Sequence, residues 1–107
     1  MSTIYIAGKV TGLPVDEARS SFDKVTKYFT QKGYKVINPM ELIKDPKTEW
    51  NTAMKICIAE LVKVDAVYLM DNWKDSAGAT FEREISKRLE IPVFTSPWCV
   101  DEYLKKL

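Results

Sequence analysis

The sequence predicts a single doubly wound α/β domain, in which helices cover both faces of a parallel sheet of four to five strands. Short β-rich runs alternate with helical periods along all 107 residues, an order typical of such domains. The strand-like runs are spaced far enough apart for right-handed crossover helices between them. The run at residues 66–70 is apolar almost throughout, as expected of a central parallel strand buried on both faces. The size of the chain favours one domain over residues 1–107.

In the first half of the chain, a long helix separates two predicted strands. Residues 3–7 are rich in β-forming side chains. The apolar side chains of residues 15–31 recur with a helical period. Gly33 then ends this helix, because glycine tolerates the backbone conformation found just past a helix end. Residues 34–37 form the second strand, and residues 40–49 are expected to be irregular, with an Asp-Pro pair as a breaker.

The second half repeats the alternation after this irregular segment. Residues 50–62 carry an apolar stripe and predict a helix, which leads into the central strand. A further helix is expected over residues 79–89, followed by a fourth strand at residues 91–94. The last residues, 100–107, form a short terminal helix. This order of elements predicts a fold of the flavodoxin or Rossmann-like type.

Composition narrows the classes of function. Because 16 basic residues are balanced by 15 acidic ones, no surface devoted to DNA or RNA is indicated. No apolar run approaches the ~20 residues that a membrane helix needs, and the first residues lack the basic-then-apolar order of a secretory signal. We therefore expect a cytoplasmic protein that binds neither polymeric nucleic acid nor a membrane.

The residue types present limit the possible chemistry. The sequence contains no histidine, which excludes His-based triads and His-ligated metal sites. Cys57 and Cys99 lie far apart, so neither a zinc ribbon nor a thioredoxin-type pair is expected. Both are expected to be buried or partly buried free thiols. Any catalysis must therefore rest on carboxylates, hydroxyls and backbone groups, without a metal or cofactor.

Open α/β sheets bind ligands beyond the carboxyl ends of their strands. The loop after the first strand, residues 8–12, contains two glycines but matches neither a Walker A loop nor the dinucleotide-binding pattern. It is either a turn before a helix or a place where a sugar or phosphate approaches the backbone. Asn38 and Trp73 follow later strands at the same edge, where Trp73 either stacks on a base or covers the core. Asp65 lies at the opposite edge, where we expect it to cap or end the preceding helix.

Glu82 lies near the start of the helix that follows the third strand. The small-residue turn at residues 76–81 places a helix N-terminus here, where negative charge is favoured. At roughly 100° per residue, Phe81, Ile85 and Leu89 would form the inward face of the helix, with Glu82 on its margin. Two interpretations stay open. Glu82 either takes part in chemistry or complements the helix dipole, an effect of about 0.3–1 kcal/mol.

Four runs of residues, in their order and spacing, resemble a known superfamily. They are IYIAG at residues 4–8, GYKVINP at 33–39, DAVYL at 65–69 and SAGATFE at 76–82. The chain resembles the nucleoside 2-deoxyribosyltransferase superfamily, and more closely its small branch of DUF4406 proteins. The resemblance covers nearly the whole chain. It implies a homodimer or a larger homo-oligomer, because relatives complete their sites across subunits.

The resemblance also implies an activity. Relatives with known activity cleave the N-glycosidic bond of 2′-deoxynucleosides or their 5′-monophosphates. By this resemblance Glu82 is the nucleophile that attacks C1′ of the deoxyribose, and the sugar then passes to a second base or to water. Tyr5 positions that carboxylate, and Ser76 contacts a 5′-phosphate, which favours a monophosphate over a free nucleoside. The expected substrate-binding residues are Gly8, Asn38, Trp73, Ser76 and Gly78.

One position departs from the pattern of the superfamily. Catalytic relatives carry an aspartate that protonates the departing base, and Cys57 stands at that position here. A thiol is a poor acid for this step because its reference pKa is much higher. Asp71 or Asp75 is then expected to serve as the general acid. The alternatives are a non-catalytic module that binds or senses a nucleotide, and a structural domain whose cleft is filled and whose Glu82 is paired with a Lys or Arg.

Overall fold

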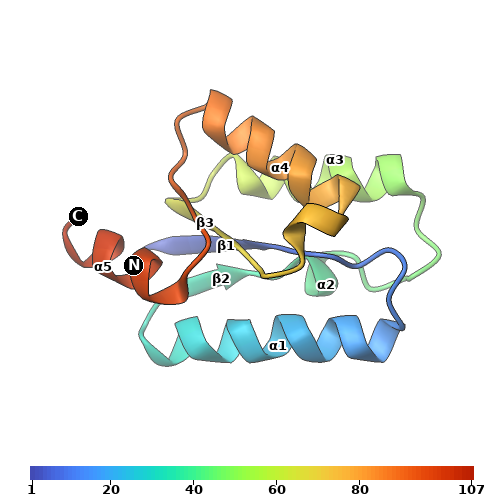
Figure 1. The fold of residues 1–107 in the computed structure, drawn as a ribbon, viewed down its shortest axis with the longest axis horizontal. Helices are drawn as coiled ribbons and strands as arrows, with labels where there is room; N and C mark the ends of the chain where they lie inside the picture. The colour runs from blue at the N-terminus through green and yellow to red at the C-terminus, as the bar shows by residue number, and fades with distance from the viewer.

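The computed structural model describes residues 1–107, which form a sheet of four parallel strands. The strands are β1 Thr3–Ala7, β2 Lys35–Ile37, β3 Ala66–Leu69 and β4 Val93–Phe94. Their order across the sheet is β2-β1-β3-β4, and Figure 1 labels the first three of these strands. Winding therefore reverses between β1 and β3, and in open α/β sheets this is the point where ligands bind. The predicted doubly wound fold is confirmed, with four strands.

Helices cover both faces of the sheet. They are α1 Val15–Gln31, α2 Pro39–Leu42, α3 Trp50–Leu61, the 3₁₀ helix η1 Trp73–Asp75, α4 Ala77–Arg88 and α5 Pro97–Lys105. Helices α1 and α5 lie on one face, and α3 and α4 lie on the other (Figure 1). Alternate residues of β1 enter the two layers, so that Ile4 and Ile6 face α1 whereas Tyr5 and Ala7 face α3 and α4. None of the helices has the length and apolar character needed to cross a membrane.

Most predicted elements are confirmed to within a few residues, and the differences have local causes. Residues 39–42 form one helical turn where the sequence predicts irregular structure. Pro39 suits a first helical turn, and the Asn38 side chain accepts a hydrogen bond from the Met40 amide at 2.9 Å. Helix α5 likewise begins at Pro97, three residues before the predicted start. The fourth strand contains two residues instead of four.

The inward face of α4 differs in part from the predicted one, although Ile85 packs against the core layer as expected. Phe81 and Leu89 are 44% and 55% exposed, whereas Ala79, Glu82 and Ser86 are buried. The small side chains allow the helix to lie close to the sheet, and the Ser86 hydroxyl donates a hydrogen bond to the main-chain oxygen of Glu82 at 2.7 Å. The Glu82 side chain therefore points into the layer between α4 and the sheet. The sequence predicts it on the margin of the inward face of the helix instead.

Two carboxylates link separate elements by hydrogen bonds at the amino ends of the strands. Asp65 does not cap the preceding helix as expected, because α3 ends at Leu61. Its Oδ2 accepts a hydrogen bond from the main-chain amide of Thr3 at 2.8 Å and thereby links β3 to β1. Asp101 of α5 is 4% exposed and accepts a hydrogen bond from the Tyr34 hydroxyl at 2.6 Å. This second contact holds α5 against the start of β2.

Candidate active site

A cleft of about 920 Å³ lies at the carboxyl edge of the sheet. Its walls come from the loop after β1 with the start of α1, from the segment that runs from α2 into α3, and from the first turns of α4. These elements surround the point between β1 and β3 where the winding reverses. Of the predicted site residues, Gly8, Asp75, Ser76, Gly78 and Glu82 line the cleft.

Glu82, which lines this cleft, forms a buried pair with Tyr5, which lies outside the cleft lining. Glu82 is 5% exposed, Tyr5 is fully buried, and the Tyr5 hydroxyl donates a hydrogen bond to Oε2 of Glu82. Burial raises the pKa of Glu82 to about 7, against a smaller lowering by the hydrogen bond from Tyr5. Burial, followed by the nearby charge of Glu82, holds the pKa of Tyr5 well above its usual value, so the hydroxyl keeps its proton. A carboxyl group that ionises near neutral pH inside a cleft is suited to nucleophilic or acid–base chemistry.

Cys57 lies beside this pair on the wall that α3 contributes. Both cysteines of the chain are free, and Cys57 is 5% exposed. Burial raises the pKa of the Cys57 thiol to about 11, with the Tyr5 hydroxyl acting in the opposite direction. The group therefore stays a neutral thiol near pH 7, and it is neither a strong acid nor a ready nucleophile.

The start of α4 presents hydrogen-bond donors to the cleft. The Ser76 hydroxyl accepts a hydrogen bond from the Ala79 amide at 3.0 Å and lies 3.5 Å from the Gly8 carbonyl oxygen. The amides of Ala77 and Gly78 have no acceptor within the protein, as is usual in the first turn of a helix. These donors and the helix dipole favour an anionic group at this end of the cleft.

Two glycines allow close contacts around the site. A Cβ atom at Gly8 would lie 2.7 Å from Sδ of Met70, a distance that no side chain tolerates without movement. A Cβ atom at Gly78 would lie 3.2 Å from Sδ of Met54. The missing side chains therefore bring the loop after β1 against the end of β3, and α3 against the start of α4.

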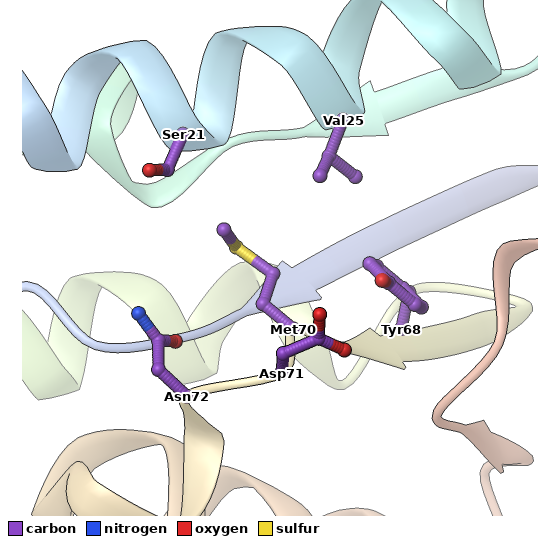
Figure 2. A pocket seen from close by; sticks show the side chains of 6 residues that line it. All are labelled: Ser21, Val25, Tyr68, Met70, Asp71 and Asn72. Carbon is purple, nitrogen blue, oxygen red and sulfur yellow. The ribbon is translucent and has the colours of Figure 1, made fainter.

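Asp71 does not join the cleft. It lines a separate cavity of about 230 Å³ between the end of β3 and α1. Figure 2 shows Asp71 beside Met70 and Tyr68, on the side of the sheet that faces α1. Glu82 belongs to the opposite layer, so the structure places these two carboxylates in different cavities. Of the two expected general acids, Asp75 alone lines the cleft with Glu82.

Asn38 and Trp73 also lie outside the cleft lining. Asn38 is 2% exposed, its Oδ1 accepts from the Met40 amide, and its Nδ2 donates to Oγ1 of Thr26 at 3.1 Å. The ring of Trp73 packs against the core layer beneath α4, with the Arg83 guanidinium 5.1 Å from its centroid. The contacts of both side chains are thus made within the protein.

The cleft contains four further residues of chemical interest that are not among the predicted site residues. They are Arg19, Lys44, Asp45 and Trp50. Lys44 and Asp45 belong to the irregular segment, where no periodic pattern indicates a direction, whereas Trp50 begins α3 and shares a helix face with Met54. Arg19 follows Val15 by one helical turn and therefore lies on the same face of α1. This helical spacing is the one signal in the sequence that could have placed Arg19 at the carboxyl edge of the sheet. No cluster of three or more Cys, Asp or Glu side chains is arranged to hold a metal ion.

The chain belongs to the family described as a domain of unknown function, DUF4406, whose model matches residues 2–95. Among solved structures, it is similar to a 2-deoxyribosyltransferase from the bacterium Bacillus psychrosaccharolyticus, with 22% sequence identity and a TM-score of 0.61. The similarity covers 86% of this chain and 69% of the other. No curated protein matches the sequence. The resemblance expected from the sequence is therefore confirmed at the level of family and fold.

Proposed function

We propose that the protein cleaves or transfers at the N-glycosidic bond of a 2′-deoxynucleoside or its 5′-monophosphate, with Glu82 as the nucleophile. The observation that supports this most directly is that Glu82, paired with the buried Tyr5, lines an open cleft. The shared fold with a 2-deoxyribosyltransferase supports the same substrate class. Tyr5 is the positioning residue, because its hydroxyl holds one carboxylate oxygen and leaves the other free.

The proposed reaction has two steps. In the first, a carboxylate oxygen of Glu82 forms a bond to C1′ of the deoxyribose, while the bond from C1′ to the base nitrogen breaks. The electron pair of the broken bond goes to that nitrogen, which takes up a proton. In the second, water or another base attacks C1′ while its proton passes to the carboxylate that protonated the first base, and the bond from C1′ to Glu82 breaks to release Glu82 as a carboxylate. Water as the acceptor makes the protein a hydrolase, and a base makes it a transferase.

The proton for the departing base is assigned to Asp75. Cys57 does not suit this role because burial raises its pKa to about 11. Asp71 lies in the other cavity. Asp45 also lines the cleft, but one of its carboxylate oxygens accepts a hydrogen bond from the Lys47 amide at 2.9 Å and so serves the local turn.

A 5′-monophosphate is the proposed form of the substrate. The free amides of Ala77 and Gly78 and the hydroxyl of Ser76 are suited to phosphate oxygens. Arg19 and Lys44 add two positive charges to the same cleft. A free nucleoside would leave these groups without a counter-charge.

Release of free base is the test of this proposal. The purified protein is incubated with each 2′-deoxynucleoside and each 5′-monophosphate, with and without a second base, and the products are separated by chromatography. Glu82→Gln is expected to lower the rate more than about a thousandfold. Glu84→Gln is the matched control, since this residue of the same helix is exposed and pairs with Arg88. A wild-type protein that releases or exchanges no base, or an active Glu82→Gln variant, would contradict the proposal.

The second candidate function is a module that binds a nucleotide without turnover. Cys57, at the position where relatives carry an acid, favours it. This function predicts that a nucleotide raises the melting temperature while no base is released. The purely structural interpretation is not supported, because the cleft is open and none of the ion pairs includes Glu82.

A further inference from the structure

One face of α3 forms a continuous wall of the cleft. Trp50, Met54 and Cys57 are spaced so that they share this face, and all three line the cleft. Met54 and Cys57 are 8% and 5% exposed, whereas Trp50 is 45% exposed. Cys57 lies beside Glu82. Cys57 follows Trp50 by seven positions in the helix, a rise of roughly 10 Å, which is comparable to the length of a nucleoside.

The indole of Trp50 is held in a defined position although almost half of it is exposed. Its ring stacks against Phe81 of α4, with 6.5 Å between the ring centroids and 29° between the planes. Its Nε1 lies 3.8 Å from the place where a Cβ atom of Gly78 would be. Both neighbours belong to the first turns of the helix that carries Glu82. The wall therefore ends in a flat apolar surface whose remaining exposed area a planar ligand could cover.

We propose that Trp50 stacks on the base of the substrate and makes the cleft selective for ligands that carry a base. This inference rests on the proposed function, because it places the sugar at Glu82 and the base farther along α3. The other tryptophans do not compete for the role. Trp73 is packed beneath α4, and Trp98 is absent from the cleft lining.

Binding is tested in the Glu82→Gln background, in which turnover is removed. The probes are 2′-deoxyadenosine 5′-monophosphate and 2-deoxyribose 5-phosphate, which carries an anomeric hydroxyl in place of the base. Trp50→Ala is expected to weaken binding of the nucleotide roughly tenfold to a hundredfold, as for loss of one base–aromatic stack, and to leave the sugar phosphate unaffected. Trp50→Phe keeps an aromatic face and is expected to restore most of the affinity. Trp73→Phe is the matched control.

Intrinsic fluorescence supplies a second readout. With Trp73 and Trp98 both changed to Phe, the remaining emission comes from Trp50, and the nucleotide is expected to quench it while the sugar phosphate is not. Unchanged nucleotide affinity in Trp50→Ala, or equal weakening of both probes, would overturn the inference. A third outcome would also overturn it. If light scattering shows that the protein is a dimer, and Trp50→Ala dissociates this dimer without changing the nucleotide affinity, then a second copy covers the indole.

The failure of this inference can be told apart from the failure of the proposed function. If Trp50 is needed for nucleotide binding while the wild-type protein releases no base, the proposed catalysis is wrong and the base contact stands. If base is released at the wild-type rate by Trp50→Ala with unchanged KM, catalysis stands and the base contact is wrong.

Discussion

Ionisation of Glu82 sets the expected pH dependence of the reaction. Under the proposed function the carboxylate is the nucleophilic form. The pKa of Glu82 is about 7, so base release is expected to increase as the pH rises through neutrality. Tyr5→Phe removes the hydrogen bond that lowers this pKa and is expected to shift the midpoint to higher pH. Profiles of rate against pH for both proteins measure the shift. An unchanged midpoint would show that Tyr5 does not act on the carboxylate.

The same ionisation is expected to weaken the fold near neutral pH. The pKa of Glu82 rises from 4.5 in the reference state to about 7 in the folded protein, so the folded state retains a proton that the unfolded chain has released. The stabilisation from this group is complete below about pH 4.5 and is lost as the pH rises through about 7. Glu82→Gln cannot ionise, and it is expected to increase the free energy of unfolding by about 1–3 kcal/mol at pH 8.

Urea denaturation of wild type and Glu82→Gln at two pH values checks this effect. The two proteins are expected to be equally stable at about pH 4, where Glu82 is protonated in both the folded and the unfolded chain. A Gln variant that is less stable than wild type at pH 8 would contradict the assigned cause.

The sequence alone singles out Glu82, because an acid beside the apolar face of a helix at the carboxyl edge of the sheet indicates either a chemical role or a complement to the helix dipole. Its contact with Tyr5 follows from the resemblance, and its degree of burial does not follow from the sequence at all. Burial depends on the close approach of α4, which Ala79 and Ser86 permit. Hydrophobicity alone predicts that Phe81 faces inward. In the structure the small side chains of Ala79 and Ser86 face inward and Phe81 is exposed.

At the level of secondary-structure elements, the cap of α4 has a structural role, and we propose that it also contacts the phosphate of the substrate. Ser76→Ala removes the hydroxyl that accepts from the Ala79 amide and is expected to lower the free energy of unfolding by about 1 kcal/mol. Ser76→Asp keeps an oxygen acceptor at the cap and is expected to retain stability. Its negative charge is expected to weaken binding of a 5′-monophosphate relative to the free nucleoside. Urea denaturation and calorimetric titration separate the two roles, and tight binding of the monophosphate by Ser76→Asp would refute the phosphate contact.

Elements with a strong periodic pattern are predicted best. Helix α1 is confirmed at both ends, because its apolar period is long and a glycine follows it. The segment before α3 carries no such period, and its one-turn helix depends on an Asn cap and a proline at residues 38–39. This segment contributes Lys44 and Asp45 to the cleft. The least predictable part of the chain is therefore one wall of the candidate site.

For the molecule as a whole, acid is expected to release the contact that holds the last helix. Hydrogen bonds from Tyr34 and Lys105 lower the pKa of Asp101. The stabilisation from this carboxylate is present above its usual pKa of 3.8 and is lost as the pH falls through the lowered value. Asp101→Asn is expected to be less stable than wild type at pH 7, with a difference that narrows below about pH 4.

Thermal unfolding of wild type and Asp101→Asn across this pH range measures the contribution of Asp101. Asp65→Asn is a useful comparison, because Asp65 also ties two elements at the same edge of the sheet but accepts from a main-chain amide. A difference between Asp101→Asn and wild type that stays constant down to pH 2 would contradict the assignment.

The architecture of the whole molecule follows from the alternation of apolar runs and helical periods, and the two core layers follow from the alternation of side chains along β1. The depth of the cleft does not follow, because it depends on contacts between elements that are far apart in sequence. Asp71 and Asp75 illustrate this point. They are neighbours in one loop, yet they line different cavities.

Tyr5 and Glu82 lie 77 positions apart, on the first strand and on a helix near the end of the chain. Their hydrogen bond requires β1, β3 and α4 to be assembled, so it is a contact between residues with a very large sequence separation. No short segment of the chain can retain it. The raised pKa of Glu82 is therefore a property of the completed fold. A spectroscopic signal from this carboxyl group would report on cooperative unfolding of the whole domain.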